Sequence, residues 1–173
     1  MKQTVVLFFA LFRVTLSWAQ IDVNLDINGE YQTVVEIEDS SSNLYKKTKE
    51  WIVSSYINPD EVTVADEKNQ YIKIRGSQPE SSTDGLANPS FHYTLNIEFK
   101  EGRYRITYNI IKLYTTGQYG SVWTYDNYYN KNKGVIRKMN EAKVERIKGV
   151  VDKLLNNHFD FVTKKEKSVD DDW

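Results

Sequence analysis

The stretch YTTGQYGSVWTYDNYY, from Tyr114 to Tyr129, carries the side chains in this sequence that are best suited to bind another molecule. Tyr and Trp rings offer a large contact area for little lost side-chain entropy, and their polar tips tolerate water before a partner arrives. We therefore predict a recognition surface for a protein or glycan partner. Its candidate binding residues are Tyr119, Trp123, Tyr125, Tyr128 and Tyr129.

The same aromatic residues also have a purely structural interpretation. Val122, Trp123 and Tyr125 could extend a sheet or seal its edge against the helix that follows. In the binding interpretation, strand alternation would place Tyr119, Trp123 and Tyr125 on one side, so that these three could reach a ligand together. If the rings only pack, the next place for a site is the polar sheet face around His92, Asn96, Arg105 and Asn109.

Residues for catalysis or metal binding are few. The two histidines are His92, on the polar side of an expected strand, and His158, near the end of an expected helix. We interpret each as a surface or helix-end histidine, because neither belongs to a metal-ligand spacing or a known catalytic motif. We predict no catalytic residue, no metal site and no cofactor.

Carboxylates are plentiful, and two of them could act as acid and base in glycoside hydrolysis. A small secreted carboxylate-dependent hydrolase, such as a glycosidase, is therefore the alternative function. A cleft with two carboxylates about 5 to 10 Å apart would favour it. Cross-strand ion pairs on a solvated face are sufficient to explain Glu98, Lys100, Arg103 and Arg105.

The N-terminus has the three parts of a secretory signal. Lys2 precedes an apolar run from Val5 to Phe12, and the small residues Ser17 and Ala19 fit a cleavage site. We predict cleavage after Ala19 and export to the periplasm or the extracellular space. The apolar run is too short for a transmembrane segment. A sequence without Cys cannot be lipid-anchored through a thiol.

Charge and length limit the function classes. Removal of residues 1–19 takes Lys2 and Arg13 from 23 basic residues, which leaves 21 against 24 acidic residues and a net charge of −3. An acidic chain is a poor partner for nucleic acid, so none is expected. We predict an irregular segment over residues 20–30, one domain over residues 31–162 and a charged, disordered tail over residues 163–173.

The remaining elements follow from hydrophobic periodicity. A short strand over residues 33–38 precedes a helix that Ser41 or Ser42 caps and that ends near Asn58. Its buried face is expected to contain Leu44, Thr48, Trp51, Ile52 and Ser55, which recur at helical spacing. Residues 61–66 and 71–77 predict a hairpin. Residues 91–99 and 104–110 alternate strictly between apolar and polar, which indicates the central hairpin of a sheet with one buried face. A last helix is expected from about Ile136 to His158.

These elements predict the α+β class: one antiparallel sheet of about five strands with two helices packed on one face, in the order β-α-β-β-β-β-α. The stripe of the last helix is predicted to consist of Ile136, Met139, Asn140, Lys143, Ile147, Val150, Val151, Leu154 and Leu155.

Three segments carry a resemblance to a known family. LYKKTKEWI (residues 44–52), DEKNQYIKIRG (residues 66–76) and YTLNIEFKEGRYRITY (residues 93–108) resemble, in order and spacing, a family of exported Bacteroidota domains of unknown function with a TBP-like fold. The resemblance implies a β-α-β4-α unit and supplies no catalytic residues. TATA-binding proteins grip DNA with the open sheet face of a doubled version of this fold, but a shared fold does not carry function.

Overall fold

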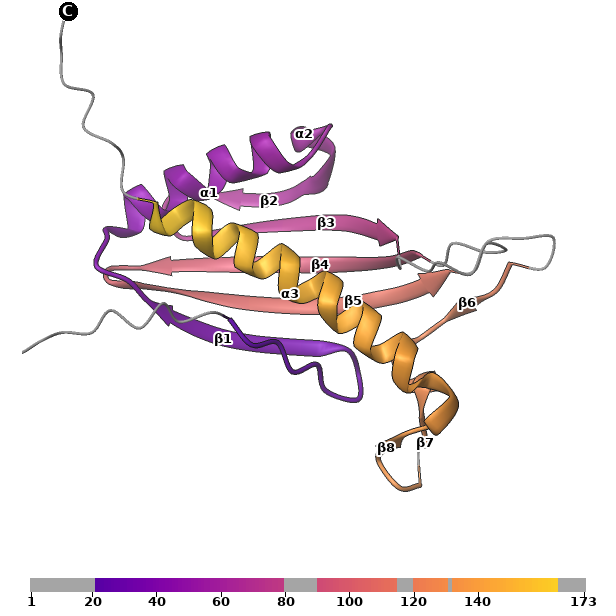
Figure 1. Cartoon of the computed structure of the whole chain (residues 1–173). Helices are drawn as coiled ribbons and strands as arrows, with labels where there is room; N and C mark the ends of the chain where they lie inside the picture. Colours follow the sequence, from indigo (N-terminus) through magenta and orange to yellow (C-terminus); the bar gives the residue numbers. More distant parts are fainter. Residues whose placement is uncertain (1–20, 80–89, 115–119, 131, 165–173) are drawn as a thin grey trace, which may run out of the picture.

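The structure is a computed structural model that describes residues 21–79, 90–114, 120–130 and 132–164 (Figure 1). The first part of the chain forms β1 (Glu30–Glu36), α1 (Ser41–Ser55), α2 (Pro59–Val62), β2 (Thr63–Glu67), β3 (Tyr71–Pro79), β4 (Ser90–Lys100) and β5 (Arg103–Tyr114). The second part forms β6 (Val122–Trp123), the 3-10 helix η1 (Tyr125–Tyr128), β7 (Tyr129–Asn130), β8 (Val135–Ile136), the 3-10 helix η2 (Lys138–Asn140) and α3 (Glu141–Thr163). The predicted leader, Tyr119 and the tail from residue 165 lie outside the described residues.

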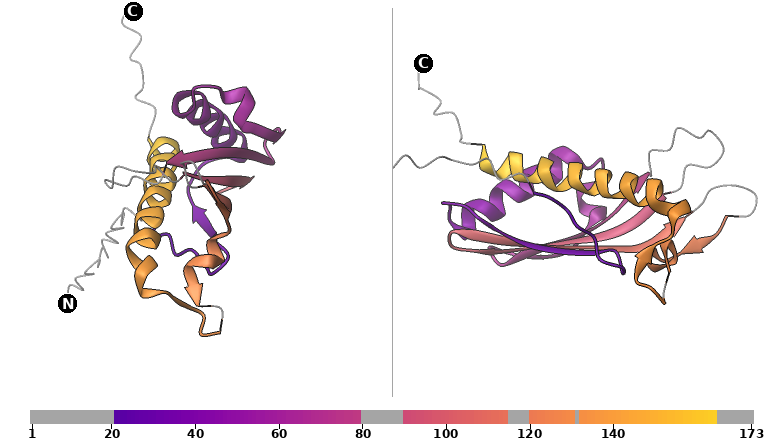
Figure 2. Two further views of the ribbon diagram at one scale, coloured as in Figure 1. Left: turned by 90° about the vertical axis from the view of Figure 1, so that its right-hand side faces the viewer. Right: turned by 60° about the horizontal axis from the view of Figure 1, so that its bottom comes forward.

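The strands build the predicted antiparallel sheet. Its order is β1-β5-β4-β3-β2, and β6 pairs with the end of β5 through Leu113 and Tyr114. The described sheet thus has six strands where about five were expected, and β7 and β8 form a separate pair. Both long helices, α1 and α3, lie on one face of the sheet (Figure 2). The predicted class and layer arrangement are confirmed.

The central hairpin follows its sequence pattern residue by residue. The apolar positions of β4 and β5 face the helices and are at most 5% exposed, namely Phe91, Tyr93, Leu95, Ile97, Phe99, Tyr104, Ile106, Tyr108 and Ile110. Because successive side chains of a strand point to opposite faces, the polar positions between them lie on the face without helices. The two-layer prediction is confirmed for this hairpin.

The helix α1 begins at Ser41, and its N-cap lies one residue earlier than expected. The Ser40 hydroxyl accepts a hydrogen bond from the backbone N–H of Asn43 at 3.1 Å, so Ser40 is the cap rather than Ser41 or Ser42. The buried face contains Leu44, Thr48, Trp51 and Ile52, as the stripe predicts, whereas Ser55 is exposed.

The helix α3 differs from the prediction at both ends. It begins at Glu141, Ile136 belongs to β8, and Met139 is 81% exposed in η2. The buried stripe is Val144, Ile147, Val151, Leu155, His158 and Val162. The expected stripe was placed too early because Ile136 belongs to the β7–β8 pair, which we call the appended hairpin, and Met139 belongs to η2.

None of the helices in the described part of the chain is both long enough and apolar enough to cross a bilayer.

An extended segment, residues 21–25, closes the side of the core between α3 and β1. Its alternate residues Ile21, Val23 and Leu25 are buried. The backbone N–H of Ile21 donates to Asn156 Oδ1 at 2.8 Å, and that of Val23 donates to Asp152 Oδ1 at 2.9 Å. The segment forms neither helix nor strand, but its alternate side chains belong to the core.

Candidate functional site

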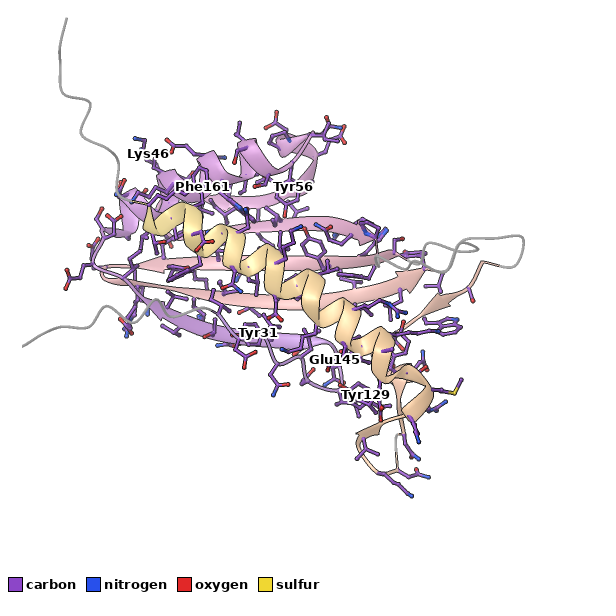
Figure 3. All side chains as sticks on the ribbon, in the orientation of Figure 1. Tyr31, Lys46, Tyr56, Tyr129, Glu145 and Phe161 are labelled. Carbon is purple, nitrogen blue, oxygen red and sulfur yellow. The ribbon has the colours of Figure 1, made fainter. Side chains whose placement is uncertain are left out.

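Three of the five predicted binding residues are packed inside the protein. Tyr125 and Tyr128 lie in η1, Tyr129 lies in β7, and they are 2%, 4% and 8% exposed. The ring centroid of Tyr125 is 5.8 Å from that of Tyr128 and also 5.8 Å from that of Tyr129. The pKa of the Tyr125 phenol is raised, chiefly by burial and to a smaller extent by the neighbouring Tyr129. Figure 3 places Tyr129 beside the beginning of α3, so these rings join the appended hairpin to the core.

Trp123 is the one described candidate with a substantially accessible ring. It is 38% exposed and pairs with Leu113 across the short β5–β6 ladder. The expected strand alternation between Trp123 and Tyr125 is wrong, because the chain enters a 3-10 helix at Tyr125. Tyr119 lies outside the described residues. The buried rings would have to leave the core before they could contact a partner, so their role in binding stays a prediction.

The prediction of a surface or helix-end position is wrong for His158. This residue is fully buried, its Nε2 lies 3.0 Å from the Thr48 hydroxyl, and its ring packs edge-on against Trp51 with a centroid separation of 4.9 Å. Among the described side chains, its Nδ1 and the nearby Tyr104 hydroxyl have no hydrogen-bond partner. Burial lowers the pKa of His158 to about 3, which keeps the ring neutral. It is a core residue rather than a general base exposed to substrate.

The other histidine occupies its predicted place on the polar face of β4. The ring of His92 packs against that of Tyr114, with centroids 4.4 Å apart. Both side chains are half-buried. The described residues contain no group of three His, Cys, Asp or Glu side chains placed to hold a metal ion.

The sheet face without helices is the second candidate site, and the pairing registers define its rows. One row crosses the sheet from Val34 through Arg105 and Glu98 to Tyr71, and the next runs from Gln32 through Thr107 and Asn96 to Lys73. A third runs from Glu30 through Asn109 and Thr94 to Arg75. We call this surface the open face. It presents polar and charged side chains on four paired strands.

Ion pairs organise one end of the open face. Arg105 donates to Glu98, and the Asn96 amide also donates to Glu98, at 3.1 Å. Arg103 lies 3.8 Å from Glu36 on the neighbouring strand. These contacts agree with the interpretation of the hairpin charges as cross-strand pairs.

A shallow depression of about 220 Å³ lies at the same end of the open face. It is lined by Val34, Glu98, Lys100, Arg103, Tyr104 and Arg105. Glu98 is its one carboxylate, and Arg105 already holds it. The depression therefore lacks the pair of facing carboxylates that glycoside hydrolysis requires.

Basic residues outnumber acidic ones on the open face. The registers assign Lys73, Arg75, Lys100, Arg103, Arg105 and Lys112 to it, together with Glu30, Glu36, Glu67 and Glu98. Lys73 and Arg75 are exposed and form no ion pair with another described residue. The whole chain has a net charge of −1, so this surface is positive relative to the rest. The alternation of apolar and polar residues in β3 contained this signal for Lys73 and Arg75, but the predicted site included neither of them, nor Lys112 of β5.

The antiparallel sheet, the two helices on one face and the bare opposite face define an α+β domain of the TBP-like class. Residues 31–114 match the family described as "Domain of unknown function (DUF4468) with TBP-like fold". The predicted resemblance is confirmed in family and fold. The match ends with β5, so the appended hairpin and α3 lie beyond it.

Two solved structures are similar to this chain. A crystal structure of a DUF4468 family protein from Bacteroides ovatus superposes with a TM-score of 0.63 at 13% identity, covering 84% of this chain and 93% of that one. A TBP-like protein from Parabacteroides distasonis gives a TM-score of 0.60 at 17% identity, covering 81% and 96%. At these identities the likeness concerns the fold alone. No curated protein matches this chain.

Proposed function

We propose that this protein is a non-catalytic binding domain that holds a partner protein on the open face of its sheet. The observation that carries the proposal is the open face itself, a charged surface on paired strands that no helix of the described chain covers. The opposite side of the same strands is packed at 0 to 5% exposure, which holds the backbone of this surface in place. A surface fixed in advance loses little entropy when it binds.

The charges favour a partner with an acidic surface. Glu98 and Glu36 are already held by Arg105 and Arg103, whereas Lys73 and Arg75 remain available. Complementary charges speed association and select among partners. A partner that presents carboxylates to β3 would therefore bind best.

Other ligand classes fit this surface less well. Glycans favour exposed aromatic platforms, and Tyr125, Tyr128 and Tyr129 are buried. Nucleic acid binding draws on many phosphate contacts, but four glutamates lie among the basic residues of the open face. A hydrolase is not supported, because the depression on this face offers a single carboxylate that is already paired.

We also infer export to the periplasm or beyond, from the sequence of residues 1–19. The first residue of the mature protein would be Gln20, directly before the buried Ile21. N-terminal sequencing of protein from culture fractions tests this inference. Mature protein that still began at Met1 would contradict it.

Affinity capture tests the binding proposal. The mature protein and the variant Lys73→Glu/Arg75→Glu serve as baits for an envelope extract of the source organism. The matched control is Lys153→Glu/Lys164→Glu, with one change in α3 and the other directly after it. We expect a protein that the wild type and the control capture and that the open-face variant loses. Equal capture by all three baits, or loss with both variants, would contradict docking on the open face.

A further inference from the structure

The appended segment between β5 and α3 exposes several large apolar side chains. The described residues contain eight exposed large apolar side chains, and four of them come from this segment: Val122, Trp123, Val135 and Met139. Single exposed apolar residues are common on protein surfaces, but a group within one short segment indicates a contact surface.

The segment lies at one end of the molecule. β6 pairs with the end of β5, and β7 and β8 form a separate hairpin beyond the sheet at the end where α3 begins (Figures 1 and 2). Met139 lies in η2, immediately before α3. The exposed apolar residues are therefore presented by a projection rather than by a flat side of the domain.

The projection is held to the body by specific contacts. The Asn140 amide donates to the carbonyl of Tyr128 at 3.2 Å, and Arg137 donates through Nε to the carbonyl of Tyr129 at 3.1 Å. The two tyrosine rings are buried, and Gly134 closes the turn with a φ of 63°. These contacts fix which residues point outward.

Positive charge accompanies the apolar residues. Residues 132–140, NKGVIRKMN, contain Lys133, Arg137 and Lys138 and no acidic residue. All three are exposed. These nine residues are thus positively charged in a chain whose net charge is −1, and Glu141 follows them directly. We call the set Val122, Trp123, Lys133, Val135, Arg137, Lys138 and Met139 the end patch.

We propose that the end patch docks on the surface of an anionic lipid bilayer. Apolar and Trp side chains insert into the boundary between headgroups and acyl chains, while neighbouring Lys and Arg residues contact the anionic headgroups. The small size of the patch favours this occupant over a protein. A stable protein interface takes about 20 to 30 residues on each side. The inference does not depend on the function proposed for the open face.

Vesicle flotation tests the proposal. The probe is a set of large unilamellar vesicles, either pure phosphatidylcholine or phosphatidylcholine with phosphatidylglycerol. The protein begins at Gln20, because the apolar run of residues 5–12 would itself bind lipid. We expect binding to the anionic vesicles at low salt, weaker binding at high salt, and little binding to pure phosphatidylcholine.

Two variants separate the charges from the apolar side chains. Lys133→Ala/Lys138→Ala should lower the partition coefficient about 25-fold, from about fivefold for each basic residue. Val135→Ser/Met139→Ser should also lose most of the binding. Two controls change exposed residues elsewhere on the surface. They are Ile57→Ser, at a position where the side chain is 99% exposed, and Lys68→Ala, at an exposed lysine.

The affected residues are exposed, so the variants should retain the melting temperature of the wild type. Failure of the wild type to float with anionic vesicles at low salt would overturn the proposal, and would assign the end patch to a protein partner or to none. Equal binding by wild type and both end-patch variants would overturn it as well.

Discussion

The Nε2 atom of His158 lies 3.0 Å from the Thr48 hydroxyl oxygen, and this contact joins the two long helices inside the core. The His158 ring also packs edge-on against Trp51 and against Tyr104, at centroid separations of 4.9 and 5.3 Å. Burial lowers the pKa of His158 to about 3, since no described carboxylate faces the ring to stabilise a positive charge. The stability of the fold therefore depends on an uncharged histidine.

The first prediction is a loss of stability in mild acid. The unfolded chain takes up a proton on His158 below about pH 6.5, whereas the folded protein does so only near pH 3. The stability that the neutral His158 contributes is therefore fully present above about pH 6.5, and it is lost as the pH falls towards 3. Between pH 7 and pH 5 the free energy of unfolding should fall by about 2 kcal/mol. Urea titrations at a series of pH values measure this loss.

The variant His158→Gln is the control for that titration, because it cannot gain a proton. Its stability should be nearly flat over the same range. Asp39 does not contribute to this slope, because its pKa lies below the range of the titration. Burial opposes its ionisation, but hydrogen bonds from Asn43 and Lys47 lower its pKa below the ordinary 3.8. A slope that survives in His158→Gln would show that another group causes it.

The second prediction concerns Trp51, which is fully buried and donates through Nε1 to Asn157 Oδ1 at 2.8 Å. Trp51→Ala should cost about 3 to 5 kcal/mol, as removal of a large core aromatic does. Trp123→Ala, at the exposed ring of β6, should cost less than about 1 kcal/mol. Denaturant midpoints compare the two, and equal losses would refute the assignment of Trp51 to the core.

The third prediction concerns Gly76, which lies opposite Tyr93 in the β3–β4 ladder. A Cβ atom added at Gly76 would lie 2.4 Å from the Tyr93 hydroxyl, which is itself 2.8 Å from the Tyr56 hydroxyl. Because Tyr93 is buried and stacked on Tyr108, it cannot move aside easily. Gly76→Ala should therefore destabilise the protein by about 1 to 3 kcal/mol.

Two further variants test that explanation. Gly149→Ala, in α3, adds a methyl group with nothing within 4 Å and should stabilise by about 0.5 to 1 kcal/mol. In a Tyr93→Leu background, Gly76→Ala should cost much less than in the wild type, because the clashing ring is gone. The same cost in both backgrounds would mean that the effect comes from the strand and not from Tyr93.

The sequence predicted the elements whose periodicity is regular. Strict alternation from Phe91 to Phe99 and from Tyr104 to Ile110 identified the central hairpin and its buried side. The helical spacing of Leu44, Thr48, Trp51 and Ile52 identified the face of α1 that is buried against the sheet. These patterns are local, so they can be recognised without knowledge of the tertiary contacts.

The features that were missed depend on partners far away in the sequence. Ile21 and Val23 enter the core because Asn156 and Asp152 bind their backbone, and nothing in the local sequence indicates this. His158 has the spacing of the buried stripe, but its polarity suggested the surface. For the tyrosines of η1 and β7 the sequence left both packing and binding open, because their burial depends on contacts with distant parts of the chain.

The central claim is that a partner protein binds the open face, and the most direct measurement is the dissociation constant of the captured partner for matched variants. For Lys73→Glu/Arg75→Glu we predict a dissociation constant at least about tenfold higher than that of the wild type, with the difference shrinking at high salt. For Lys153→Glu/Lys164→Glu on the helix side we predict a value within about twofold of the wild type. Unchanged affinity in the open-face variant, with weakened binding in the helix-side variant, would contradict the account.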